Sequence, residues 1–209
     1  MKNFSIKEAL KFGWLKTKEN LWFLIGLQII VYIVNVLVDD SLFILGTLIS
    51  IFTGFVLSWT FFRLAHDEKI NFKNLFAEFS FERFLHYLVV SIIVGVLVCL
   101  GFIFLIIPGI IIMTMTSFAQ FVILEKNAKL SWKKFAPWEA VKTSAQITKG
   151  VRWKVFLVIL VSLGVNILGV VAFGVGLLIT VPLTAIAIIS VYKKLKSHTH
   201  SEVKAEVVN

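Results

Sequence analysis

Three long segments without a single Lys or Arg constrain this chain more than any other feature of its sequence. They are residues 21–62, 84–124 and 155–192, and all 21 basic residues lie between or outside them. Each segment is too long for one membrane crossing, because about 40 residues of helix would reach roughly 60 Å, twice the hydrocarbon thickness. Each segment is therefore expected to cross a membrane and return as a helical hairpin.

The composition supports this interpretation. Of 209 residues, 58% are hydrophobic and 16% are charged, and the mean hydropathy of +0.92 lies outside the range of a soluble domain. We expect an all-α integral membrane protein with six transmembrane helices arranged as three hairpins. Every hairpin begins and ends beside Lys or Arg, so the positive-inside rule places both termini and both long loops in the cytoplasm of a cell inner membrane.

Tryptophan and net charge point to the same face of the membrane. The six Trp residues lie near the basic ends of the hairpins, where an indole keeps its ring in the apolar zone and its N–H among headgroups. The net charge of +9 is concentrated on that side. This distribution favours attraction to an anionic inner leaflet over nucleic-acid binding, which would need a basic soluble domain.

An interfacial amphipathic helix is predicted ahead of each hairpin. In the first, Ile6, Leu10 and Trp14 share one face and lysines take the other. Ahead of the third hairpin, Pro137 suits the first turn of a helix, because a backbone N–H would be unpaired there in any case. Ahead of the middle hairpin, an apolar stripe of Phe and Leu falls within residues 72–79.

The first and third hairpins, with their leading helices, match at a constant offset of 131 residues. The matching pairs are Glu8/Glu139, Ala9/Ala140, Lys11/Lys142, Thr17/Thr148, Lys18/Lys149, Trp22/Trp153, Asn35/Asn166, Thr53/Thr184 and Leu64/Leu195. An ungapped match of this length predicts an internal repeat. The chain is expected to form a single membrane domain, 1–196, with repeat units at about 4–65, 70–124 and 136–195, and a flexible cytoplasmic tail, 197–209.

The outer turns are short. They are expected at Asp39-Asp40, at Pro108-Gly109 and between Gly169 and Gly176. So little chain projects outside that a receptor for an external protein or sugar is excluded. An alternative leaves the middle hairpin re-entrant, since its turn offers no polar residue to headgroups.

The sequence lacks the motifs that are typical of catalytic sites. The chain has no H-E-x-x-H, G-x-S-x-G or phosphate-loop motif, its four His residues are scattered, and Cys99 is its one cysteine. We therefore predict a protein that is not an enzyme, with no catalytic residue, no cofactor and no metal.

Polar and small residues inside the predicted helices indicate packing. The amides Gln28, Asn35, Gln120 and Asn166 are expected to form interhelical hydrogen bonds, and Asn35 and Asn166 could bond to each other across a pseudo-axis. The alternative is that these amides line a polar path. Small residues at four-residue spacing, Gly46/Ser50/Gly54/Ser58 and Gly176/Thr180/Thr184, predict close helix contacts within the chain or between copies.

A family resemblance rests on a series of short motifs in the second half. They are Pro108-Gly109, Ser117-Phe118 running to Leu124-Glu125, Trp138-Glu139-Ala140-Val141, Ser144, Thr148-Lys149-Gly150, Gly174-Val175-Gly176, Pro182-Leu183 and Tyr192. In this order, about residues 104–195 resemble the glycerophosphoryl diester phosphodiesterase membrane domain and its YciC-like relatives among uncharacterised bacterial membrane proteins. The resemblance implies a multi-helix inner-membrane domain. It implies no catalytic position, because the phosphodiesterase barrel would need roughly 250 further residues.

The expected function is that of a non-enzymatic bacterial inner-membrane protein, a membrane scaffold or lipid-interacting module acting at the cytoplasmic leaflet. The expected partners are anionic inner-leaflet lipids, with a second copy or another membrane protein left open and no nucleic acid. The alternative is a transporter or permease for a small or lipidic substrate. The candidate headgroup contacts are Lys7, Lys11, Lys133, Lys134, Lys142, Lys149, Arg152, Trp14, Trp138 and Trp153.

Overall fold

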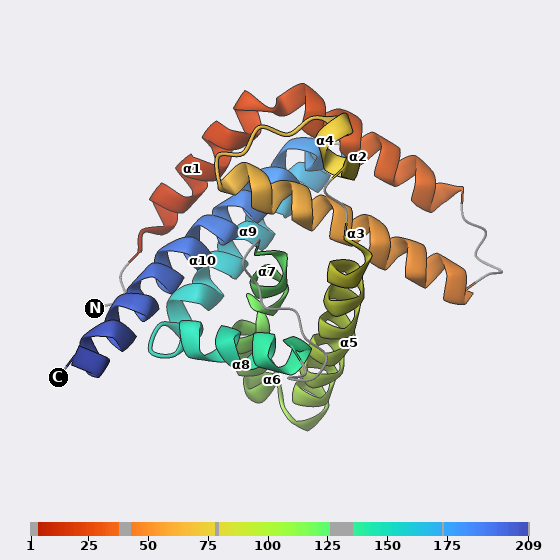
Figure 1. Cartoon of the computed structure of the whole chain (residues 1–209). Coiled ribbons are helices and arrows are strands. Elements are labelled where there is room, and N and C mark those ends of the chain that lie inside the picture. The colour runs from red at the N-terminus through yellow and green to blue at the C-terminus, as the bar shows by residue number, and fades with distance from the viewer. Residues whose placement is uncertain (1–3, 38–42, 78–79, 126–135, 173, 209) are drawn as a thin grey trace.

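Helices form all of the regular secondary structure that the structure describes (Figure 1). This computed structural model describes residues 4–37, 43–77, 80–125, 136–172 and 174–208, which include no strand. In chain order the helices are α1 (Ile6–Glu19), α2 (Leu21–Val36), α3 (Phe43–Ala65), α4 (Phe72–Ala77), α5 (Phe81–Phe104), α6 (Ile106–Thr116), α7 (Ala119–Leu124), α8 (Ala136–Thr148), α9 (Arg152–Val171) and α10 (Leu177–Val208). The all-α prediction is confirmed.

The described chain has five helical segments that are long and apolar enough to cross a membrane. They are Gly46–Ala65, Phe81–Ile103, Ile106–Leu124, Arg152–Val171 and Leu177–Thr199. These segments indicate a multi-pass membrane protein. The two segments expected to form the middle hairpin are among them, so each has the length of a full crossing.

The remaining expected crossing, which is the first in chain order, differs from these five. Helix α2 has 16 residues, which span about 24 Å, less than the hydrocarbon core of roughly 30 Å. It follows α1 after a bend of 85°, and the two helices give a sixth candidate only if the bent pair counts as one span. Asp39 and Asp40, expected in the turn beyond α2, lie outside the described residues.

Helix α1 packs along α10, so the two ends of the chain lie side by side (Figure 1). The buried face of α1 consists of Ala9, Gly13 and Thr17. A Cβ atom at Gly13 would overlap the backbone oxygen of Leu183 and touch Ala187. Glycine at this position therefore lets the two helix backbones approach closely.

Helix α8 uses a face of the same kind against α6 and α7. Its residues Ala140, Ser144 and Thr148 are buried, and each lies 131 positions after a residue of the buried face of α1. Ser144 sits at the break between α6 and α7, where it accepts a hydrogen bond from the Phe118 N–H (3.1 Å) and donates one to the Met115 carbonyl (2.6 Å). The hydroxyl thus satisfies backbone groups that the broken helix leaves unpaired.

Helices α5 and α6 pack against each other and are connected by one extended residue, Leu105. The turn expected at Pro108-Gly109 is misplaced, because both residues belong to the first turns of α6. Proline is tolerated there since its missing N–H has no helical partner. A Cβ atom at Gly109 would lie 2.7 Å from the ring of Phe102, so the glycine allows α6 to lie against α5.

The two predicted small-residue stripes behave differently. Before α10, a Cβ atom at Gly176 would lie 2.7 Å from the backbone oxygen of Gly169 in α9, which is the close contact expected. On α3, a Cβ atom at Gly54 would meet nothing within 4 Å. The stripe on α3 is therefore not a close seam at Gly54 within one chain.

Two elements differ in length from their predictions. The helix ahead of the middle hairpin, α4, has only six residues, and Phe79 of its expected stripe lies outside the described residues. The predicted tail, 197–209, continues α10 as helix to Val208. That stretch contains no Gly or Pro and several strong helix formers, so nothing in it stops the helix.

Candidate functional site

The predicted cationic headgroup contacts are at the surface wherever the structure describes them. Lys7, Lys11, Lys142 and Lys149 are exposed, whereas Arg152 is partly buried. Lys133 and Lys134 lie outside the described residues. The cations are thus distributed over α1, α8 and the start of α9.

The predicted Trp contacts are also exposed. Trp14, Trp138 and Trp153 expose 47%, 41% and 71% of their surface. On α8, the Lys142 ammonium lies 5.9 Å from the centre of the Trp138 ring, and it also pairs with Glu139 at 3.3 Å. An aromatic ring and a cation therefore share one surface of this helix.

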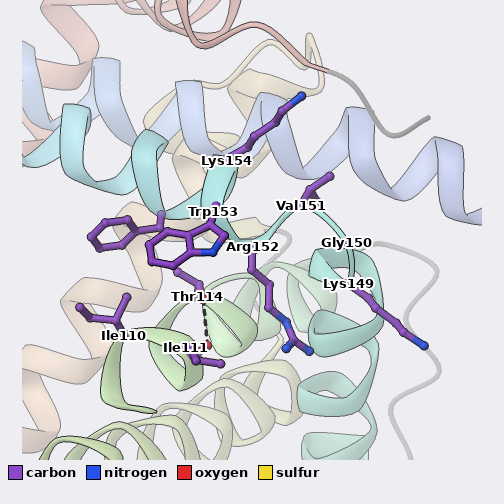
Figure 2. A pocket seen from close by; sticks show the side chains of 10 residues that line it. Ile110, Ile111, Thr114, Lys149, Gly150, Val151, Arg152, Trp153 and Lys154 are labelled. Carbon is purple, nitrogen blue, oxygen red and sulfur yellow. Dashed lines mark hydrogen bonds between the residues drawn. The ribbon is translucent and has the colours of Figure 1, made fainter. Parts of the chain in front are cut away.

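One group of these residues lines a common cavity of about 580 Å³ between α6 and the start of α9, here called the α6–α9 groove (Figure 2). The sequence-predicted residues in its lining are Lys149, Arg152 and Trp153. The remaining lining residues are Ile110, Ile111, Thr114, Gly150, Val151, Lys154 and Phe156. Lys7, Lys11 and Trp14 belong to α1 and are not part of this group.

The backbone that forms the groove is set by Gly150. This residue has a φ of +84°, a conformation that side chains with a Cβ atom rarely adopt, and it follows the last turn of α8. Helix α9 then starts after Val151, whose side chain makes no capping hydrogen bond. The first N–H groups of α9 consequently have no side-chain acceptor from the N-cap.

The electrostatics of the groove are one-sided. Its described lining residues include three cations and neither Asp nor Glu. The Nε atom of Arg152 is buried and has no hydrogen-bond partner among the described residues. On the opposite wall, the Thr114 hydroxyl donates to the Ile111 carbonyl (2.8 Å), so this donor is used within α6.

The four predicted amides all bond to a neighbouring helix. Gln28 donates to the Leu178 carbonyl (2.8 Å), and Gln120 donates to the Ser91 hydroxyl (3.0 Å). Asn35 and Asn166 do not bond to each other. Instead, Asn35 donates to Thr53 (3.1 Å) and Asn166 donates to Thr184 (3.2 Å). The signal for these acceptors was in the sequence, because Thr53 and Thr184 also match at the offset of 131.

Several residues of the motifs that carry the resemblance meet in the core. The Tyr192 hydroxyl donates to Glu125 (2.8 Å), which also forms an ion pair with Lys196. The Tyr192 ring lies 5.5 Å from that of Phe118, and both are fully buried. These motif residues join α7 to α10, which is a structural role.

A separate ionic contact joins α1 to the loop after α3. The Lys16 ammonium lies 2.8 Å from the carboxylate of Asp67, and this hydrogen bond lowers the pKa of Asp67 and raises that of Lys16. Near the start of α1, the hydrogen bond from Lys194 lowers the pKa of Glu8. Among the described residues, no three His, Cys, Asp or Glu side chains are grouped to hold a metal ion.

Comparison with known proteins gives a family match to part of the chain. Residues 96–199 match the model of a protein family of unknown function (DUF975). The matched segment contains every lining residue of the α6–α9 groove and overlaps the stretch that carries the family resemblance. No curated protein and no solved structure matches the chain. The resemblance to phosphodiesterase membrane domains therefore stays a prediction.

Proposed function

We propose that this chain is a non-enzymatic, lipid-interacting module of a bacterial inner membrane. In this proposal both termini are cytoplasmic, and the Lys and Trp side chains of α1 and α8 bind the anionic headgroups of the inner leaflet. Lysines near a charged membrane surface contribute about 1 kcal/mol each, and Trp fixes depth.

The observation that carries the proposal is the pairing of exposed Trp with exposed Lys on two helices whose other face is packed. Trp14 shares α1 with Lys7 and Lys11, and Trp138 shares α8 with Lys142. A soluble protein would bury most of such indole surface, whereas a membrane interface accommodates both the ring and its N–H. The arrangement is typical of helices that contact headgroups.

We also infer that the first and third units are copies of one repeat. The offset of 131 pairs α1 with α8, α2 with α9 and α3 with α10. It also relates the two buried small-residue faces and the two Asn–Thr hydrogen bonds. Two similar membrane-contacting helices on one chain are suited to a scaffold.

The amide geometry favours this function over a permease. Each of the four amides donates to a neighbouring helix, which is the ordinary packing role of such residues. No described observation favours a substrate path over that role.

The test is binding of the purified full-length protein to liposomes of anionic phosphatidylglycerol or neutral phosphatidylcholine with the same acyl chains. Because a membrane protein would insert into the liposomes, it is first reconstituted in nanodiscs. The liposomes then compete with the nanodisc lipids for the exposed face of the protein. We expect a preference for anionic lipid. Replacing Lys7, Lys11 and Lys142 with Gln is expected to weaken it about 100-fold, the equivalent of roughly 1 kcal/mol for each lysine.

The matched control replaces the same lysines with Arg, which keeps the charge and is expected to retain the preference. Equal binding of the unmodified protein to both lipids would contradict the proposal.

A further inference from the structure

The α6–α9 groove combines two chemically different halves. One half is formed by the segment Lys149–Lys154, which contributes its cations and the start of α9. The other is formed by Ile110 and Ile111 of α6 together with Phe156 of α9. These apolar residues belong to segments long enough to cross a membrane. A ligand that fits both halves must carry an anionic group and an apolar chain.

Arg152 supplies the strongest requirement for an anion. Its Nε is buried without a hydrogen-bond partner among the described residues, and a buried donor left unsatisfied is destabilising, more so when charged. The described lining of the groove offers no carboxylate to compensate this charge. A phosphate in the groove would compensate the charge of this guanidinium, a group that binds phosphate through parallel hydrogen bonds.

The start of α9 adds a second attraction for the same group. Its first N–H groups lack a capping side chain, and the positive end of the helix dipole lies there. Figure 2 shows Arg152 and Trp153 extending toward the side of α6, whereas Lys149 and Lys154 extend away from it. Arg152 is therefore the direct contact, and the two lysines contribute charge at the rim.

We propose that the α6–α9 groove is a specific site for the phosphate of an anionic glycerophospholipid, with an acyl chain lying along α6. The inference rests on the proposed lipid-interacting function and assigns it one binding site. Free phosphate would leave the apolar wall of Ile110, Ile111 and Phe156 without a partner. The cavity volume of about 580 Å³ is in the range of pockets that enclose small molecules.

The site is expected once per chain. At the offset of 131, Lys149 and Trp153 correspond to Lys18 and Trp22, but Arg152 corresponds to Leu21. Gly150, whose backbone shapes the groove, corresponds to Glu19. The bend between α1 and α2 therefore keeps a Trp and a Lys but lacks both the arginine and the glycine.

The test is native mass spectrometry of the full chain purified in detergent, titrated with phosphatidylglycerol, with phosphatidylcholine of the same acyl chains, or with inorganic phosphate. We expect one tightly retained phosphatidylglycerol per chain and at least tenfold weaker retention of phosphatidylcholine. Arg152→Gln is expected to weaken phosphatidylglycerol retention at least tenfold. Lys73→Gln makes the same change of charge at an exposed position of α4, outside the groove, and is the matched control, expected to leave this lipid in place.

A second variant guards against misfolding of the arginine variant. Ile111→Trp fills the groove without changing its charge and is expected to displace the lipid, with intrinsic fluorescence reporting that the protein still unfolds cooperatively. Retention of phosphatidylglycerol by both variants would overturn the site. If inorganic phosphate protected the protein against thermal unfolding as well as phosphatidylglycerol does, the lipid would be overturned as the ligand of the groove.

The outcomes separate this inference from the proposed function. If Arg152→Gln keeps the retained lipid while the triple Lys→Gln variant still loses its preference for anionic membranes, the site is wrong and the proposed function stands. If the unmodified protein prefers neither lipid in either assay, both are wrong.

Discussion

A single hydroxyl group stabilises the break between helices α6 and α7. Ser144 of α8 bonds to both the N–H and the carbonyl that face each other across the gap between α6 and α7. Its partner residue Phe118 is fully buried, so water does not replace the hydroxyl there. Ser144 and Phe118 are separated by 26 positions, and their pairing is a tertiary contact that sequence motifs alone do not reveal.

Ser144→Ala is expected to lower the free energy of unfolding by about 1–3 kcal/mol, because it leaves a buried N–H without an acceptor. Thermal unfolding in detergent, followed by intrinsic Trp fluorescence, measures the change. Ser190→Ala is the matched control: Ser190 donates only to the Ala187 carbonyl of its own helix, and its replacement is expected to have a much smaller effect. Equal effects of the two substitutions would contradict the assigned role.

Asp67 combines a charge with an unusual backbone conformation. It has a φ of 60° and pairs with Lys16 across two elements. Asp and Asn tolerate this left-handed conformation better than Ala does. The residue therefore contributes to stability through its backbone and, separately, through its charge.

Asp67→Ala is expected to cost about 1 kcal/mol more than Asp67→Asn, because only Asn keeps the tolerance for positive φ. The pKa of Asp67 is lowered in the fold. Its ionic contribution is therefore present at neutral pH and is lost as the pH falls through that lowered value. The difference in stability between the unmodified protein and Asp67→Asn should shrink between neutral pH and about pH 3; a constant difference would contradict the ionic part.

At the scale of the element, α1 and α8 each have a small-residue face that packs against other helices and a second face that carries Trp and Lys. The hydrophobic pattern of the sequence predicts only the second face. The spacing of Ile6, Leu10 and Trp14 predicts an apolar face, of which Trp14 is exposed whereas Ile6 and Leu10 pack, partly buried, against the core. The face that packs consists of Ala9, Gly13 and Thr17, whose low hydropathy leaves no signal in a hydrophobic pattern. The sequence match at the offset of 131 did mark two of these positions, since Ala9 and Thr17 correspond to Ala140 and Thr148.

Gly13→Ala is expected to destabilise the protein by about 1–3 kcal/mol, because the new Cβ would meet the backbone of α10, which cannot move aside cheaply. Gly95→Ala in α5 is the matched control. A Cβ at Gly95 meets nothing within 4 Å, so this change should be neutral or stabilising by up to about 1 kcal/mol. Unfolding of both variants in detergent decides the matter, and similar stabilities would contradict the close α1–α10 contact.

At the scale of the whole molecule, the basic-free segments predict the helical class and the multi-pass character well. The positions of Lys and Arg are sufficient for this, because the cost of charge in hydrocarbon is large and local in sequence. The α6–α9 groove could not be predicted from the sequence. Lys149, Arg152 and Trp153 were candidates, but their approach to Ile110 and Ile111 depends on how α9 packs against α6.

Orientation in the membrane is tested by single cysteines in a Cys99→Ser background. Val175→Cys lies in the exposed turn before α10, and Lys7→Cys and Lys142→Cys lie on exposed faces of α1 and α8. With cytoplasmic termini, a membrane-impermeant maleimide should label only Val175→Cys in intact cells. The two lysine replacements should react after permeabilisation. Labelling in the opposite order would reverse the proposed topology.

The contact between α1 and α10 sets an order for synthesis. The ribosome produces α1 first, but the helix that covers its small-residue face begins only at Leu177. Until that helix emerges, the small-residue face of α1 lacks the helix that covers it, although Lys16 of α1 can already pair with Asp67 after α3. The α1–α10 contact therefore forms only after α10 has been synthesised, and a nascent chain arrested before α10 would leave the small-residue face of α1 uncovered.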